Sequence, residues 1–155
     1  GRIEPTLQRI VPQTGRYTVL AHRPYRVHQR IVPTYHSGRV LLAGDAAHVN
    51  SPSGGMGMNC GIHAAFSLAE KLAGVLAGGS EDLLALYDRQ RRPVAADEIL
   101  RQADRNRNRM RNTDPAWRRA ELARLQAIAA DPAAAREHLL ASSMITGLRR
   151  AAAIQ

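Results

Sequence analysis

A short apolar run that ends in Gly-Asp is the feature that most constrains how this chain can fold. Residues 39–43 are Arg-Val-Leu-Leu-Ala, with no alternation of polar and apolar side chains, and Gly44-Asp45 follow directly. Such a run predicts a strand buried on both faces, as in a parallel sheet with helices above and below it. The strand would deliver Asp45 to the carboxyl edge of the sheet, where open α/β sheets bind ligands.

A glycine-rich loop and a long helix are expected after this strand. The helix should begin near Gly57, because apolar residues then recur at alternating spacings of four and three, at Met58, Ile62, Ala65, Ala69, Leu72 and Leu76. Gly78-Gly79 would end it as a C-terminal cap. Unpaired backbone N–H groups at the helix start favour a ligand that carries negative charge. Glycines at positions 54, 55, 57 and 61 would let a flat ligand approach the backbone.

The glycine pattern does not match either of two common phosphate-binding motifs. Gly55-x-Gly57 is followed by Cys60 where a GxGxxG fingerprint needs glycine, and the strand lies more than ten residues upstream. That fingerprint requires a tight connection from strand to helix. A P-loop is also absent from the sequence, because no glycine is followed by Lys-Ser or Lys-Thr.

The residues on either side of this stretch differ in character. Residues 1–37 are rich in turns, and the runs 17–21 and 25–31 are β-prone. Alternation in the second run would place Arg26, His28 and Arg30 on one face, which would be solvated or would meet an anionic ligand.

From Ser80 onward the sequence predicts helices. Ser80 is a suitable N-cap for a helix over 81–92, and Pro93 should break or kink the helix before it continues over 94–111. A capping residue before a proline predicts two further helix starts, at Asp114-Pro115 and Asp131-Pro132.

Charge and composition bring in one alternative function. The chain has 155 residues and a formal net charge of +9, and Lys71 is the only lysine among its 22 basic residues. An excess of positive charge suggests a nucleic-acid partner, and Arg101, Arg105 and Arg109 would form a basic stripe on a helix. Only 4% of the residues are aromatic. Because platforms for base stacking are scarce, a solvated face is the favoured interpretation of the stripe.

Several classes of protein are excluded or disfavoured. No run of eighteen apolar residues is present, so we expect no membrane-spanning helix. The single cysteine, Cys60, excludes an intrachain disulfide and is expected to be a packing residue, while His48 and His63 are expected to be structural. With scattered histidines, a structural zinc site is not expected. No signal segment is visible after Gly1, so a reducing, cytoplasmic setting is the expectation.

Three groups of residues together carry a specific resemblance. They are Gly44-Asp45-Ala46-Ala47-His48, then Pro52 with Gly55-Met56-Gly57-Met58-Asn59, and then the run YDRQRRPV at 87–94. This set closely resembles the second flavin-binding motif of FAD-dependent aromatic hydroxylases, the p-hydroxybenzoate hydroxylase-like flavoprotein monooxygenases. The resemblance covers about residues 38–94.

The resemblance implies an α/β fold and a site for FAD. In that class the motif aspartate, here Asp45, binds the ribityl chain, and the loop proline, here Pro52, lies beside the flavin ring and the substrate. The backbone at the helix start faces the pyrimidine side of the flavin. No side chain here is expected to be a catalytic acid or base, because the flavin carries the chemistry. The expected cofactor-binding residues are Gly44, Asp45, Pro52, Gly55, Gly57, Met58 and Asn59.

Enzymes of this class hydroxylate an aromatic or related cyclic substrate with molecular oxygen and NADPH or NADH. Their N-terminal GxGxxG unit is missing here, so the resemblance implies the C-terminal portion of the fold. Residues 1–37 would end the substrate-binding β region, 38–79 would form the second FAD-binding motif, and 80–155 would form a C-terminal helical region. The chain alone should bind FAD weakly or not at all, and should be inactive.

Two alternatives stay open at this stage. One is an Arg-rich helical module that binds nucleic acid, and the other is an inactive truncated remnant. A homodimer contact through the C-terminal helices is also left open.

Overall fold

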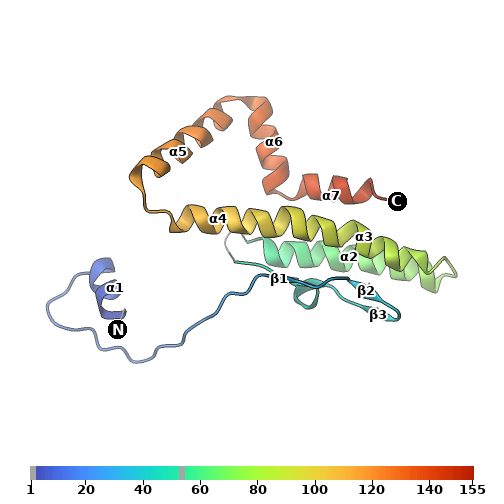
Figure 1. The fold of residues 1–155 in the computed structure, drawn as a ribbon, viewed down its shortest axis with the longest axis horizontal. Helices are drawn as coiled ribbons and strands as arrows, with labels where there is room; N and C mark the ends of the chain where they lie inside the picture. Colours follow the sequence, from blue (N-terminus) through green and yellow to red (C-terminus); the bar gives the residue numbers. More distant parts are fainter. Residues whose placement is uncertain (1–2, 53–54) are drawn as a thin grey trace.

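The computed structural model describes residues 3–52 and 55–155, with the backbone alone for 98–99 (Figure 1). Helices dominate this part of the chain, and each strand has two residues. The helical elements in chain order are α1 (Ile3–Ile10), the 3-10 turn η1 (Gly44–Ala46), α2 (Met56–Leu76), α3 (Asp82–Val94), the π-helical segment η2 (Ala95–Leu100), α4 (Arg101–Arg111), α5 (Pro115–Ala130), α6 (Pro132–Ser142) and α7 (Ile145–Ala152). The strands are β1 (Arg30–Ile31), β2 (His36–Ser37), β3 (Val40–Leu41) and β4 (His48–Val49).

The strands form two antiparallel pairs, so the prediction of a doubly buried parallel strand over 39–43 is wrong. β3 pairs with β2 in a hairpin, and β1 pairs with β4. Val40 is 61% exposed. The physical reason is that β3 has one partner strand in the described chain, and a ribbon of two strands cannot cover both faces of its residues. Gly44 and Asp45 still follow the strand closely, in η1.

The β-prone runs before the hairpin also differ from expectation. Residues 16–29 carry no regular secondary structure and run as an extended segment between α1 and β1 (Figure 1). Tyr25 is 86% exposed. Strand propensity is expressed only where a neighbouring strand accepts the backbone hydrogen bonds, and the described chain provides one only at Arg30–Ile31.

Helix boundaries follow the predicted capping residues closely. α2 ends where Gly78 and Gly79 donate backbone hydrogen bonds to the carbonyls of Val75 and Gly74, each at 2.9 Å. The Oγ of Ser80 accepts from the backbone N–H of Asp82 at 3.1 Å, and α3 begins there. The predicted caps of α5 and α6 are confirmed, since Asp114 accepts from Ala116 and Asp131 from Ala133.

Pro93 does not break the helix. It lies inside α3, and the chain continues through the wider turns of η2 into α4. Because a proline nitrogen has no hydrogen to donate, the regular bond to the carbonyl four residues earlier is lost there, and the backbone relaxes into the π-helical segment instead of ending. No helix in the described ranges has the length and apolarity needed to cross a membrane.

α3 holds the segment that leads to Gly44 and Asp45. The Tyr87 hydroxyl donates to the carbonyl of Leu42 at 2.8 Å. The Asp88 carboxylate accepts from the backbone N–H of Tyr35 and from the Thr34 hydroxyl, both at 2.9 Å. The guanidinium of Arg92 donates from Nε to the carbonyl of Val32 at 3.0 Å. The run 87–92 therefore acts as a clamp, here called the α3 clamp, on residues 32–42.

The core lies between α2, α3 and this clamped segment. Its buried members are Tyr35, Ala47, Met56, Cys60, Ala64, Tyr87, Ala95 and Met144. Inside it the hydroxyl of Tyr35 lies 3.0 Å from Nδ1 of His48, and the two rings stack with centroids 6.0 Å apart. His48 is only 4% exposed. This confirms the expectation that His48 is a structural histidine.

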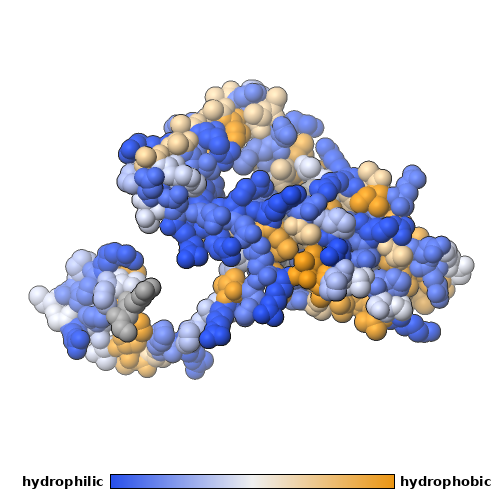
Figure 2. Space-filling view, in the orientation of Figure 1, coloured by the Kyte–Doolittle hydropathy of each residue, from blue (hydrophilic) through white to orange (hydrophobic). Residues whose placement is uncertain are grey.

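The apolar stripe predicted on α2 faces outward. Met58 and Leu76 are 74% and 79% exposed, and Ile62 and Leu72 are exposed as well. Phe66, which was not part of the predicted stripe, is also exposed. Figure 2 shows apolar surface where α2 runs alongside α3. Smaller residues, Cys60 and Ala64, make the buried contact instead. Exposed apolar residues that form a stripe along one helix face are typical of an interaction surface.

Removing the Tyr87 hydroxyl tests the α3 clamp. We expect Tyr87→Phe to lower the free energy of unfolding by about 1 kcal/mol, because the Leu42 carbonyl loses its donor while the ring keeps its packing. Urea denaturation measures the change. Tyr25→Phe, at an exposed tyrosine, is the matched control and should stay within about 0.5 kcal/mol of the parent. Equal stability of Tyr87→Phe and the parent would show that this hydrogen bond does not secure the hairpin.

His48 should make stability depend on pH. Burial, and then the positive charge of Arg91, holds the pKa of His48 below its ordinary value of 6.5. The unfolded chain therefore binds a proton more readily, so stability that is present above pH 6.5 is lost as the pH falls toward the folded pKa.

We expect His48→Gln to lose stability less steeply than the parent as the pH falls below about 6.5, in thermal denaturation at a series of pH values. Some slope should remain, because burial also lowers the pKa of His63. His22→Gln, on the exposed segment, should behave as the parent does. A parent-like slope in His48→Gln would contradict the prediction.

Candidate functional site

A cleft of about 560 Å³ gathers most of the residues that the sequence marked. Part of its lining comes from η1, β4 and the start of α2, and another part, here called a wall, comes from residues 25–28. The lining residues are Tyr25, Arg26, Val27, His28, Asp45, Val49, Asn50, Pro52, Gly55, Gly57 and Met58. Of the seven residues expected to bind a cofactor, five line this cleft: Asp45, Pro52, Gly55, Gly57 and Met58.

The other two expected residues lie just outside the cleft. Gly44 lies in η1 and backs onto α2, since a Cβ atom on Gly61 would lie 3.4 Å from the Cα of Gly44. Asn59 faces away, toward a second pocket that it shares with Ser142 and Ser143, and its amide donates to the carbonyl of Gly55 at 3.2 Å. The predicted close approach at Gly54 lies outside the described residues.

Asp45 is available to a ligand. The residue is exposed to solvent, and its carboxylate accepts no hydrogen bond from the residues that the structure describes. A free carboxylate in a cleft can accept hydrogen bonds from hydroxyl groups, as a polyol chain would offer.

The start of α2 forms the positive end of the same cleft. Gly55 has a φ of 66°, a left-handed conformation that favours glycine, and no side chain caps the helix. The first backbone N–H groups of this 21-residue helix therefore have no side-chain acceptor within the described chain. Together with the helix dipole they favour negative charge at this end.

Asn50 was missed by the sequence analysis. It lines the cleft, and its Nδ2 is buried without a hydrogen-bond partner among the described residues. A Cβ atom on Gly57 would lie 2.8 Å from the Oδ1 of Asn50, so glycine is needed for the amide to sit against the helix start. No signal in the sequence singles out Asn50, because its position depends on β4 turning it toward α2.

Residues 25–28 also have a position that the sequence did not predict. The alternation in 25–31 left open whether Arg26 and His28 are solvated or meet a ligand, and the structure shows that both line the cleft with Asp45. Gln29 anchors this wall, since its amide donates to the carbonyl of Leu100 at 3.3 Å and to the Asp104 carboxylate at 3.1 Å. The cleft therefore combines one carboxylate with a cationic side chain and a helix start.

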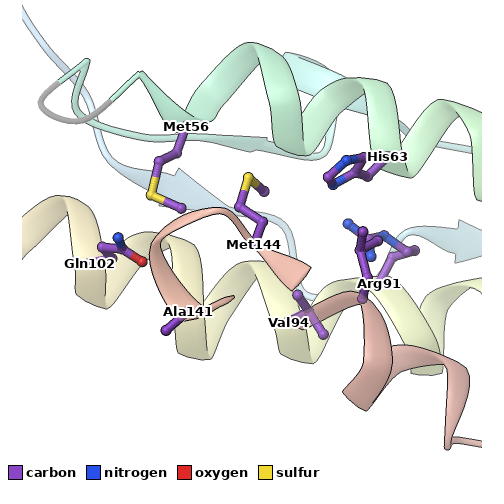
Figure 3. Close-up of a pocket in the computed structure, with 8 residues that line it drawn as sticks. Met56, His63, Arg91, Val94, Gln102, Ala141 and Met144 are labelled. Carbon is purple, nitrogen blue, oxygen red and sulfur yellow. The ribbon is translucent and has the colours of Figure 1, made fainter. Parts of the chain in front are cut away.

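Behind the start of α2 lies a buried arginine. Arg91 is 3% exposed, and no carboxylate lies within 4 Å of it among the described residues. It contacts the Cys60 thiol, and Figure 3 shows it facing His63 across a small pocket. Burial raises the pKa of Cys60 despite this positive charge, and burial followed by Arg91 lowers the pKa of His63. These shifts favour a neutral thiol and a neutral imidazole, as expected of packing residues.

A double-mutant cycle tests the contact between Gly57 and Asn50. Alanine is a better helix former than glycine, so Gly57→Ala should stabilise the chain by about 0.5–1 kcal/mol where space allows. In the parent the new Cβ meets Asn50, and the gain should be cancelled or reversed; in an Asn50→Ala background it should appear in full. Urea denaturation of the four proteins measures both effects. The same change in both backgrounds would rule out the contact.

Comparisons with known proteins find a matching family and several relatives of this chain. The family model described as FAD binding domain matches residues 3–103. The para-nitrophenol 4-monooxygenase of Pseudomonas sp. (strain WBC-3) is 38% identical over 139 residues, which cover 89% of this chain and 34% of the relative.

Solved structures give the same result. The crystal structure of p-nitrophenol 4-monooxygenase PnpA from Pseudomonas putida DLL-E4 is 36% identical and matches with a TM-score of 0.73, covering 91% of this chain and 38% of that protein. The rebeccamycin biosynthetic enzyme RebC with reduced flavin is 40% identical with a TM-score of 0.59, covering 72% and 22%.

The chain spans well under half of the length of each of these relatives. The α/β assignment and the resemblance to aromatic hydroxylases are confirmed, and no finding supports the nucleic-acid alternative. The family model matches residues 3–103, which is more than half of the chain. This chain therefore belongs to the FAD binding domain family, and it is similar to monooxygenases that act on aromatic compounds.

Proposed function

We propose that this chain supplies the ribityl and ring side of an FAD site in a flavoprotein monooxygenase. The parent reaction would be hydroxylation of an aromatic or related cyclic compound with molecular oxygen and NADPH or NADH. The observation that carries the proposal is the single cleft in which the free Asp45 carboxylate and the uncapped start of α2 lie together.

The residues present fit such a cofactor. Gly57 leaves room that a Cβ atom would fill, and the Asn50 amide beside it has an unpartnered nitrogen. A volume of about 560 Å³ lies within the range of small-molecule sites, about 300–1,000 Å³. FAD when bound supplies the redox chemistry with oxygen.

Each residue in the cleft has a distinct part in this proposal. Asp45 would accept hydrogen bonds from ribityl hydroxyls, and the backbone at Gly57 and Met58 would face the pyrimidine edge of the ring. Negative charge at that edge would be stabilised by the helix start by about 0.3–2 kcal/mol. Pro52 would lie beside the ring on the substrate side. Gly44, Gly55 and Asn59 would shape the loop that holds these groups.

The proposal includes the remaining part of the flavoprotein as a partner. The exposed apolar stripe of α2 and the extended segment 16–29, which pairs with no strand of the described chain, are surfaces that further strands and helices would cover. In this arrangement residues 1–37 end the substrate-binding region, 38–79 form the second FAD motif, and 80–155 form a helical region that could contact a second subunit. A reducing, cytoplasmic setting is part of the same proposal.

A chimera tests the assigned role of Asp45. The segment of para-nitrophenol 4-monooxygenase that matches this chain would be replaced by residues of this chain, and FAD retained after gel filtration would be measured by absorbance. We expect the chimera to hold FAD, and Asp45→Ala in it to weaken FAD binding by about ten- to a hundredfold, because hydrogen bonds to a charged group contribute about 1.5–3 kcal/mol.

Glu70→Ala is the matched control, since it removes an exposed carboxylate from α2 outside the cleft. It should leave FAD binding unchanged. A chimera that folds but holds no FAD would support the inactive-remnant alternative. FAD binding that is unaffected by Asp45→Ala would overturn the role assigned to the cleft.

A further inference from the structure

The face of α4 that looks toward the C-terminal helices is polar. Gln102, Arg105, Asn106 and Arg109 follow the i, i+3, i+4, i+7 spacing of one helix face, and all of them line the same cavity. A helix face that packs on other helices is normally apolar. Because the residues on this face of α4 are polar, the helix does not pack tightly against the following helices, and a cavity remains between them.

The space is bounded by an arch. α5 leaves the end of α4, α6 returns from it, and α7 packs against α3 (Figure 1). Figure 2 shows the opening between α4 and this α5–α6 arch. The cavity has a volume of about 470 Å³, and the arch contributes Trp117, Glu121, Arg124, His138, Ala141 and Ser142 to its lining. We call it the arch cavity.

The charge in the arch cavity is not balanced. Its single carboxylate, Glu121, is held by Arg124 through two bonds of 2.7 and 2.8 Å. The Arg124 hydrogen bond, with a further contribution from the charge of Arg109, lowers the pKa of Glu121. Arg105 and Arg109 have no carboxylate within 4 Å in the described ranges. Two guanidinium groups are therefore left for an anion from outside the chain.

We propose that the arch cavity binds a nucleoside phosphate, with the phosphate between Arg105 and Arg109 and the base against Trp117. Guanidinium groups bind phosphate oxygens in a bidentate manner, which suits the two arginines one helical turn apart. Bases stack on an indole ring, and asparagine amides such as Asn108 can pair with a base edge. The volume suits a mononucleotide or the nucleotide end of a dinucleotide.

This site is separate from the proposed flavin cleft. The two cavities have no lining residue in common, and the arch cavity lies on α4, α5 and α6. The assignment therefore does not depend on FAD binding. It also accounts for two of the three arginines of the basic stripe on α4, Arg105 and Arg109, which the flavin site does not use.

Tryptophan fluorescence tests the proposal directly, because Trp117 is the only tryptophan in the chain. The 155-residue protein would be titrated with ADP, and we expect saturable quenching. Adenosine should bind at least about tenfold more weakly, because it lacks the phosphate contacts. Titration with NADPH identifies the source: binding tighter than that of ADP points to a dinucleotide, and binding no tighter points to a free nucleotide.

Arginine variants distinguish a specific phosphate site in the cavity from nonspecific attraction of an anion to the positive charge of α4. Arg105→Gln and Arg109→Gln should each weaken ADP binding about tenfold or more. Arg111→Gln removes the same charge from the same helix outside the cavity, and should leave ADP binding unchanged. These arginines are exposed, so circular dichroism should show parent-like helix content in all three variants.

Three results would overturn the proposal. The first is the absence of saturable quenching by ADP. The second is an Arg111→Gln effect equal to that of Arg109→Gln. The third is single-stranded RNA that binds more tightly than ADP and loses affinity equally in all three variants, since that pattern indicates a general polyanion surface.

Discussion

The structure depends on the contact between α3 and the segment that precedes Gly44. Tyr87 and Asp88 bind backbone groups on both arms of the β2–β3 hairpin, at Leu42 and Tyr35, while Arg92 binds Val32 just before it. These are long-range bonds between a helix and a short ribbon that has little stability of its own. They set where the chain leaves β3, and hence where Asp45 lies relative to the start of α2. The run YDRQRRPV thus supports the candidate cleft structurally even though none of it lines the cleft.

The cleft that results is electrically uneven. The Asp45 carboxylate offers hydrogen-bond acceptors, whereas the uncapped start of α2 and the Arg26 guanidinium offer positive charge. A ligand that carries hydroxyl donors in one part and electron-rich acceptors in another would be oriented by this difference alone. Arg91, buried without a carboxylate partner in the described chain, adds a positive charge next to Met56, the first residue of α2. Family membership and local electrostatics therefore lead to the same kind of ligand.

Local structure was predicted well from particular residues. The caps at Gly78-Gly79, Asp114 and Asp131 lie where the sequence placed them, because capping depends on hydrogen bonds within a few residues. Ser80 lies one residue before the N-cap of α3, which is Glu81. The expectations for residues 17–21, 25–31 and 39–43 failed in their details for the opposite reason. Strands need partners that are distant in sequence, and a β-prone run without one stays extended and exposed.

The sequence by itself determined most helix ends after Gly55 and the motif that gathers Asp45, Pro52 and the glycines, because each rests on short-range chemistry. Only the tertiary structure decided that residues 25–28 line the cleft, that Asn50 lies against Gly57, and that the apolar stripe of α2 is exposed. It also decided that Arg105 and Arg109 face an arch. These features depend on which surfaces meet across long stretches of chain, and periodicity shows that a helix has two faces without showing what each one contacts.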